Sequence, residues 1–366
     1  MKKNKYIIVT SILILICSFY IVNINKKPKI INSINNLSLK DRNSYSFFSF
    51  INPIANEGYI FNHSFNSTKQ KKYTITDKQF SPSDAYFFNN KYYFASGAYA
   101  RNSNILSYDI NTKSFKTIET NQENYIERFY MDDKGMYITT VSDMNGCNLL
   151  YDINNNKSVS SGKDEFILDI TSLDNTIIAI SLNNTTGNCR LIKYDRNLNF
   201  LKDTNINSSI SFYPYFATND YLYLFSTFSN GEIYQIDSNL NITVLKPKLN
   251  ISFDPNSFNY GKVVSVGNNK VLCEYFYTNS QNDKSGLIEY EFTDNTLKSK
   301  TLNINSKEKL INSNYKENEV YTRESKDSKI IIKVRNLSNY DIIKVFELDN
   351  KDIIYFVSVK KSTRSN

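Results

Sequence analysis

The amino-acid sequence predicts an all-β fold, and three observations carry that prediction. Short apolar segments recur along the chain, no long segment has helical periodicity, and the segments repeat in the same order with a period in the low forties. The 366 residues are 40% hydrophobic and 22% charged, so the chain can bury a core and is not disordered by composition. The repeat therefore favours one large all-β domain.

The repeat is clearest in the acids that close the third apolar segment of successive units. Asp109, Asp152, Asp195 and Asp237 fall 43, 43 and 42 residues apart. Four short strands in a unit of this length are typical of a β-propeller blade. The second strand of a unit, for example Tyr221–Phe225, is apolar on both faces, as expected for a blade that neighbouring blades cover on both sides.

The two ends of the repeat predict how the ring closes. Residues 45–50, 59–65 and 72–75 look like a unit without its first strand, and the C-terminus supplies a spare strand over residues 352–359. Pairing that strand with the N-terminal three would complete a blade and remove an open sheet edge. We therefore expect a seven-bladed β-propeller over residues 44–360, and six or eight blades would also fit the pattern.

By this repeat the chain resembles the broad YVTN/WD40-like β-propeller superfamily over about residues 44–360. The Trp-Asp dipeptide of WD40 blades cannot occur, because the chain has no Trp, and the Gly-Gly pair of kelch blades is absent. The sialidase box and the docking motif of quinoprotein dehydrogenases also need Trp. The resemblance therefore implies the fold and little about function.

The N-terminus predicts a transmembrane helix ahead of the propeller. Residues 6–24 carry no charge, and as a helix they would span about 28 Å, close to the hydrocarbon thickness of a bilayer. Small residues suited to signal cleavage are missing, so we expect an uncleaved signal-anchor, with cleaved or lipidated forms as alternatives. Residues 1–5 would then be cytoplasmic, residues 25–43 a polar stalk, and the propeller extracytoplasmic at the cell membrane.

Charge and composition bear on partners and source. Residues 1–29 hold six lysines and no acid, so residues 30–366 carry a formal net charge of only +2, which does not predict nucleic-acid binding. Residues 361–366 form a small basic tail. Abundant Asn, Lys and Ile with only 10 Gly and 6 Pro fit the A+T-rich codons of a low-GC Gram-positive bacterium.

Residue usage also limits the chemistry. The one histidine, His63, lies in a predicted strand, so a Ser-His-Asp or Cys-His enzyme and a His-rich metal site are disfavoured. Cys147, Cys189 and Cys273 lack C-x-x-C spacing, so we interpret them as small apolar residues, with a disulfide as the alternative. We predict no cofactor and no metal, and catalysis is left undecided.

The repeated Asp-x-Asn motif is the most regular polar feature. Its Asp and Asn residues resemble the first half of a calcium-binding loop, but the Gly and the Glu that should follow are missing. An Asx turn between the third and fourth strands, in which the carboxylate accepts hydrogen bonds from local backbone N–H groups, explains the motif better.

A second set of acids has the same period. Asp84, Glu127 and Asp169 lie 43 and 42 residues apart, near the starts of the expected innermost strands. These strands line the channel of a propeller, so three carboxylates on one arc could bind a cation or divide acid and base roles. The alternative is that they are solvated acids beside strands. The remaining candidate ligand-binding residues are Arg128, which could pair with Glu127, together with Tyr213, Tyr215 and Asp254.

Three functions from different classes follow from these observations. The first is a membrane-anchored extracytoplasmic binding module for a protein, a peptide or a cell-wall glycan. The second is a glycan-cleaving hydrolase or lyase that uses channel-mouth carboxylates and Tyr. The third is a scaffold for a membrane protein complex. We favour the first, because no recognisable catalytic set accompanies the repeat.

Overall fold

The computed structural model describes most of the chain beyond the first 43 residues. Its described ranges are 44–50, 57–64, 70–76, 82–89, 91–96, 103–109, 114–122, 126–142, 146–206, 212–227, 229–279, 282–293, 296–327, 329–348 and 353–360. The predicted transmembrane helix (6–24), its flanking segments (1–5 and 25–43) and the basic tail (361–366) lie outside these residues. Within them, no helix is long and apolar enough to cross a membrane.

The described residues form seven four-stranded antiparallel sheets. Six of them consist of four consecutive strands each, and the remaining one, called the first sheet below, joins the two ends of the chain in the order β28-β1-β2-β3. Its strands are β1 (Ser44–Phe50), β2 (Glu57–Ser64), β3 (Gln70–Thr76) and β28 (Ile353–Lys360). β28 pairs with β1 along the length of that strand, from Ser44 opposite Lys360 to Phe50 opposite Ile353.

The six consecutive sheets follow the order of the chain. The second and third sheets are β4 (Pro82–Phe88), β5 (Lys91–Ser96), β6 (Ser103–Asp109), β7 (Ser114–Gln122), and β8 (Ile126–Met131), β9 (Met136–Ser142), β10 (Gly146–Asp152), β11 (Lys157–Ser160). The fourth and fifth are β12 (Glu165–Leu173), β13 (Thr176–Asn183), β14 (Cys189–Tyr194), β15 (Phe200–Ile206), and β16 (Phe212–Ala217), β17 (Tyr221–Ser226), β18 (Ile233–Asp237), β19 (Ile242–Leu245). The last two are β20 (Asn259–Gly267), β21 (Lys270–Asn279), β22 (Asn282–Thr293), β23 (Thr296–Leu302), and β24 (Lys309–Asn314), β25 (Glu319–Lys326), β26 (Lys329–Asn336), β27 (Ile342–Leu348).

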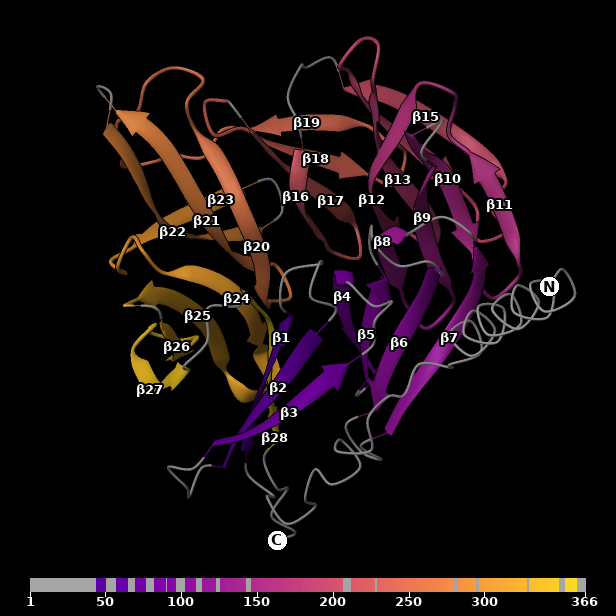
Figure 1. The fold of residues 1–366 in the computed structure, drawn as a ribbon. Helices are drawn as coiled ribbons and strands as arrows, with labels where there is room; N and C mark the ends of the chain where they lie inside the picture. Colours follow the sequence, from indigo (N-terminus) through magenta and orange to yellow (C-terminus); the bar gives the residue numbers. More distant parts are fainter. Residues whose placement is uncertain are drawn as a thin grey trace, which may run out of the picture.

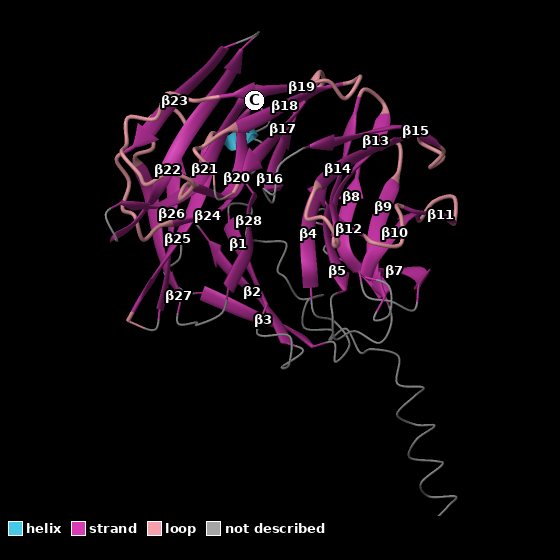
Figure 2. Cartoon of the chain, turned by 90° about the horizontal axis from the view of Figure 1, so that it is seen from above, coloured by secondary structure: helices cyan, strands magenta, loops and turns pink. Residues whose placement is uncertain are grey.

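The first strands of successive sheets lie side by side around a central axis, and the later strands of each sheet lie progressively further out (Figure 1). Figure 2, turned by 90°, shows that strands make up nearly all of the described structure. The one helical segment among the described residues is the short 3-10 helix η2 (Tyr315–Glu317). The prediction of an all-β propeller is confirmed.

Apolar side chains between neighbouring sheets form the core. One cluster combines Ile178 and Leu191 of the β12–β15 sheet with Leu222 and Ile236 of the β16–β19 sheet, and each of these side chains is fully buried. Second and third strands therefore bury both faces, which explains why their sequences are continuously apolar. This packing is the main source of the stability of the fold. It also holds the first strands around the axis.

The Asp-x-Asn motifs that begin at Asp152, Asp195 and Asp237 are Asx turns between third and fourth strands, and Asn111 of the first motif lies outside the described residues. Oδ1 of Asp195 accepts hydrogen bonds from the backbone N–H groups of Asn197 and Asn199, both at 2.8 Å. Asp237 makes the same two bonds at 2.8 Å with Asn239 and Asn241. Because local N–H groups occupy these carboxylates, the turn interpretation explains the repeat without a bound cation.

Buried tyrosine hydroxyls make the fold sensitive to alkali. Tyr260 and Tyr290 are 2% and 0% exposed, and their hydroxyl oxygens lie 2.7 Å apart. Burial raises the pKa of both hydroxyls well above the ordinary value of 10.0. Since the folded state then holds these protons more tightly than the unfolded state, their stabilising effect is complete below pH 10 and decreases as the pH rises above it.

We therefore expect the melting temperature to fall steeply above about pH 10. Tyr290→Phe should reduce this fall in melting temperature at alkaline pH. Tyr315→Phe, at a residue that is 62% exposed, should leave the fall unchanged. Thermal unfolding followed by circular dichroism between pH 8 and pH 11 measures the effect. Equal pH dependence in the wild type and Tyr290→Phe would show that this pair does not control alkaline stability.

Candidate functional site

The first strands of five sheets line an open cavity of about 1270 Å³. It is lined from β4, β8, β12, β16 and β20, and by the turns that follow β16 and β20. It therefore lies toward the end of the axis where first strands turn into second strands. Most lining side chains are polar, with hydroxyls from Thr171, Ser172, Thr218 and Ser265 and amides from Asn219, Asn268 and Asn269.

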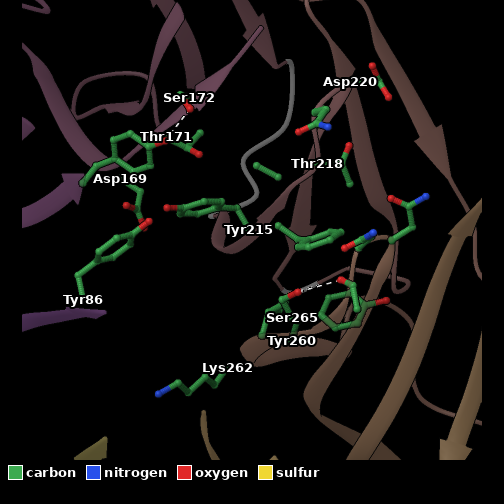
Figure 3. A pocket seen from close by; sticks show the side chains of 18 of the residues that line it. Tyr86, Asp169, Thr171, Ser172, Tyr215, Thr218, Asp220, Tyr260, Lys262 and Ser265 are labelled. Atoms are coloured by element: carbon green, nitrogen blue, oxygen red, sulfur yellow. Dashed lines mark hydrogen bonds between the residues drawn. The ribbon is translucent and has the colours of Figure 1, made fainter. Parts of the chain in front are cut away.

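One corner of the cavity gathers a carboxylate and phenol groups. Figure 3 shows the Asp169 carboxylate, the Tyr86 hydroxyl and the Tyr215 hydroxyl pointing toward one another from three different sheets. The Tyr86 ring packs edge-on against Phe129 and Tyr130, with centroid distances of 5.9 and 6.3 Å. Packing fixes this ring, so its hydroxyl is held at the corner without a further loss of side-chain entropy when a ligand binds.

The hydrogen bonds around this corner set which atoms act as acceptors. The Tyr215 hydroxyl donates to the carbonyl oxygen of Ile170 at 3.1 Å, so this phenol acts as a donor to the backbone of the neighbouring sheet. The Tyr130 hydroxyl donates to Oδ2 of Asp132 at 3.2 Å and lies 2.5 Å from Oγ of Ser172. Because Tyr130 has a single proton, Ser172 must then be the donor in the second contact, and Ser172 Oγ can accept from the cavity side.

Asp132 is held in its charged form behind this corner. Burial on its own would raise the pKa of this carboxyl group, but a 2.7 Å ion pair with Arg196 and backbone hydrogen bonds from Lys134 and Gly135 outweigh burial and lower it. Burial in turn raises the pKa of the Tyr130 hydroxyl, so this phenol is neutral at pH 7 and keeps its proton for Asp132.

Of the residues that the sequence singled out, Asp169 and Tyr215 line the cavity. Arg128 and Glu127 form an ion pair with 3.3 Å between Nη1 and Oε1, and Nε of Arg128 donates to the carbonyl oxygen of Leu168 at 2.8 Å. Arg128 therefore links two neighbouring first strands, and Glu127 neutralises its charge, which corresponds to the pairing considered from the sequence.

The strand register shows that Asp84, Glu127 and Asp169 are not at equivalent positions, although their spacing in the sequence had predicted that they are. Each of these first strands carries a β-bulge, after which Asp84 pairs with Ala95, Arg128 with Thr139, and Asp169 with Ile180. Arg128, not Glu127, thus occupies the position that matches the two aspartates. Even spacing in sequence is misleading here, because a bulge adds one residue that spacing alone cannot locate.

The remaining candidates lie in other places. The structure describes the backbone of Asp84 and Tyr213, in β4 and β16, but not their side chains. Asp254 lies in the loop before β20, where its backbone N–H donates to the carbonyl oxygen of Thr278 at 2.9 Å. Since Thr278 is near the end of β21, that loop is at the opposite end of β20 from the turn that lines the cavity.

Metal and thiol chemistry find little support in the residues described. Across the described ranges, no three His, Cys, Asp or Glu side chains are grouped so that they could hold a metal ion. Cys189 and Cys273 are buried free thiols, and burial raises the pKa of Cys189 to about 12. Both are therefore apolar packing residues at neutral pH. The side chains of His63 and Cys147 lie outside the described part.

Comparison with known proteins supports the fold alone. No protein-family model matches the chain, and no curated protein matches it. A protein of unknown function from Desulfotomaculum acetoxidans is similar over 88% of this chain and 100% of its own, with 13% identity and a TM-score of 0.56. The periplasmic gluconolactonase of Pseudomonas aeruginosa is similar over 87% and 99%, with 8% identity and a TM-score of 0.54.

A third solved structure with this fold is a hydrazine synthase of Kuenenia stuttgartiensis, with 10% identity, coverage of 75% of this chain and 92% of its own, and a TM-score of 0.51. A lactonase and a hydrazine synthase therefore share the architecture, so the fold does not identify an activity. The class that fold and site define is a β-propeller with a polar cavity on its axis.

Two tyrosines of the site, Tyr86 and Tyr130, were not identified by sequence reasoning. Each lies two residues after its register position, Asp84 and Arg128 respectively, and therefore on the same face of its strand. A search for aromatic residues at alternate positions after the acids would have found them.

Proposed function

We propose that this chain is a binding module whose axial cavity takes a hydroxyl-rich ligand, such as the end of a glycan chain. The observation that carries the proposal is the lining of the 1270 Å³ cavity, which combines hydroxyl and amide side chains with tyrosine rings. Sugars expose hydroxyls around a ring with apolar faces, so they match polar groups interleaved with aromatic surface. Of the protein, peptide and glycan ligands considered from the sequence, the glycan fits this lining best.

The proposed setting is the outer face of the cell membrane. The uncharged segment 6–24 supports a membrane-anchored chain, and the polar residues 25–43 would hold the propeller away from the bilayer. In that position a cell-wall glycan is the hydroxyl-rich polymer that such a module would meet. We further propose that the seven sheets close into a single ring, with β28 as the innermost strand of the closing blade.

A two-carboxylate hydrolase has weaker support. The carboxylates among the cavity residues are Asp169 and Asp220, and Figure 3 places them at opposite sides of the cavity. Acid and base carboxylates need to flank one scissile bond. A binding role requires no such pair.

Filling the cavity tests the proposal. Ala217→Trp adds a large ring at the end of β16, on the cavity wall, and should weaken the binding of a cell-wall glycan fragment by about tenfold or more, which corresponds to about 1.4 kcal/mol. Leu201→Trp is the matched control, because Leu201 lies on an outer strand and is 50% exposed. Isothermal titration calorimetry on the purified full-length protein measures both.

Two outcomes would contradict the proposal. One is equal affinity of Ala217→Trp and the wild type for every glycan fragment that binds. The other is that a panel of neutral, acidic and amine-bearing glycan fragments yields no binding to the wild type at all.

A further inference from the structure

An exposed tyrosine lies beside the cavity, in the sheet that follows the lining strand β20. Tyr315 belongs to η2, in the turn between β24 and β25, and at 62% it is the most exposed of the large apolar and aromatic side chains in the described part of the chain. η2 contacts β20, and Figure 2 shows it in cyan near that strand. Its turn is the counterpart of the turns after β16 and β20 that line the cavity, so all three turns lie at the same end of the axis.

Two contacts connect this turn to residues that line the cavity. Cε2 of Tyr315 lies 3.9 Å from the position that a Cβ atom would take at Gly267, the last residue of β20. Ser313, near the end of β24, donates a hydrogen bond from Oγ to the carbonyl oxygen of Ser265. Gly267 and Ser265 both line the cavity. Since Gly267 has no side chain, the tyrosine ring adjoins the cavity directly at this position.

Hydrogen bonds hold the backbone of this turn in one conformation. Oδ1 of Asn314 accepts a hydrogen bond from the backbone N–H of Glu317 at 3.3 Å, and the N–H of Asn318 donates to the carbonyl oxygen of Tyr315 at 3.1 Å. Asn318 ends the short helix in the left-handed region, at a φ of 57°, which asparagine adopts more readily than most residues. The ring is therefore presented on an ordered turn, which reduces the entropy lost when a ligand packs on it.

The neighbouring side chains suit a sugar residue. Asn268 and Asn269, in the turn after β20, line the cavity and are exposed, and each amide can donate to and accept from a hydroxyl group. A sugar ring presents hydroxyls at its edge and C–H groups on its faces, so amides beside an aromatic ring match both kinds of surface. The cavity volume of 1270 Å³ also exceeds the roughly 300–1,000 Å³ of ordinary small-ligand pockets, so the space is larger than one sugar residue needs.

We propose that Tyr315, Asn268 and Asn269 form an outer sugar-binding subsite, so that the module binds an oligosaccharide whose chain leaves the cavity across the Tyr315 ring. The inference rests on the proposed glycan function, and it adds the direction of the chain and the recognition of more than one sugar residue. An aromatic contact is worth about two- to tenfold in affinity. A long glycan should therefore bind more tightly than a short one by at least that factor.

Two glycans of different length, the disaccharide and the hexasaccharide of N-acetylglucosamine, test the inference by isothermal titration calorimetry on the full-length protein. Tyr315→Ala should weaken hexasaccharide binding about two- to tenfold and leave disaccharide binding unchanged, because only the longer chain reaches the ring. Tyr315→Phe keeps the ring and should bind both glycans like the wild type. The control is Phe200→Ala, which removes a 57% exposed ring from the outer strand β15 and should change neither affinity.

A single tryptophan reports on the ring position directly. The chain contains no Trp, so Tyr315→Trp introduces its one indole group. The hexasaccharide should shift the indole emission to shorter wavelength, because a sugar packed on the ring excludes water, and the disaccharide should leave the emission unchanged. Phe200→Trp is the matched control, and neither glycan should change its emission.

The outcomes separate this inference from the function on which it rests. Glycan binding that Tyr315→Ala leaves unchanged would overturn the outer subsite and leave binding by the cavity standing. An equal loss for both glycans would also overturn it, because the ring would then contact the first sugar residue. If the wild type binds neither glycan, the inference is refuted, and the panel of other glycan fragments decides whether the proposed function stands.

Discussion

Deleting β28 (Ile353–Lys360) should abolish cooperative unfolding of the propeller. This strand pairs with β1 along the whole length of β1, and it also lies beside β24 of the preceding sheet. Without it, β1 becomes an unpaired edge, and the first sheet contacts the last consecutive sheet without the pairing of β28 beside β24, through contacts such as the 2.9 Å hydrogen bond from Tyr45 to Glu319. The net stability of a domain is about 5–15 kcal/mol, so the loss of one whole strand pairing is large enough to exceed it.

Differential scanning calorimetry and urea unfolding of a chain that ends before β28 measure this effect, and a chain that ends after Lys360 serves as the control. Adding a peptide of residues 353–360 should restore part of the transition, because the missing strand is then supplied in trans. An unchanged unfolding midpoint in the truncated chain would show that the other sheets are stable without this closure.

Glu308→Gln should destabilise the protein by about 3–5 kcal/mol. Glu308 is 2% exposed and lies directly before β24, where Arg335 donates to both of its carboxylate oxygens at 2.8 and 3.0 Å. Lys333 and Thr322 donate to it at 2.6 and 2.8 Å. Removing its charge leaves the 8% exposed guanidinium of Arg335 without its carboxylate in a buried setting.

Urea unfolding at pH 7 measures the loss, and Glu347→Gln is the control. Glu347 pairs with Lys329, but both side chains are exposed, so that variant should lose less than about 1 kcal/mol. The outcome that contradicts the prediction is an equal, small loss in both variants.

Acid conditions provide an independent check on Glu308. Burial on its own would raise the pKa of this carboxyl group, but the hydrogen bonds from Arg335, Lys333 and Thr322 outweigh burial and hold it below 4.5. Its stabilising effect is therefore complete above the unfolded-state pKa and is lost as the pH falls through the lower folded-state value. Glu308→Gln should consequently lose less stability than the wild type on acidification below about pH 4.5.

Two buried acids, Glu308 and Glu165, occupy equivalent positions in different sheets, and sequence reasoning identified neither of them. Glu165, at the start of β12, contacts Ser181 on the second strand and Arg190 on the third. Glu308 contacts a hydroxyl on its second strand and basic residues on its third in the same way. The two acids are far apart in sequence and lie in different local contexts, and only the register of three strands shows that they occupy equivalent positions.

The candidate site was predictable in part. Asp169 and Tyr215 were identified because they lie at repeat positions in first strands, and both line the cavity. Glu127 was matched to the aspartates by spacing, whereas the bulge before Arg128 gives that position to the arginine. Spacing counts residues, and a bulge changes which of them faces the axis.

The repeat of short apolar strands by itself determined the all-β propeller, because each unit buries its apolar faces only against neighbouring units. The Asx turns could also be predicted, because an aspartate bonds N–H groups two to four residues away. Only the tertiary structure decided which side chains share the cavity. Tyr86, Asp169 and Tyr215 come from three sheets, and that they meet depends on how these sheets pack around the axis, which the sequence of any one strand does not show.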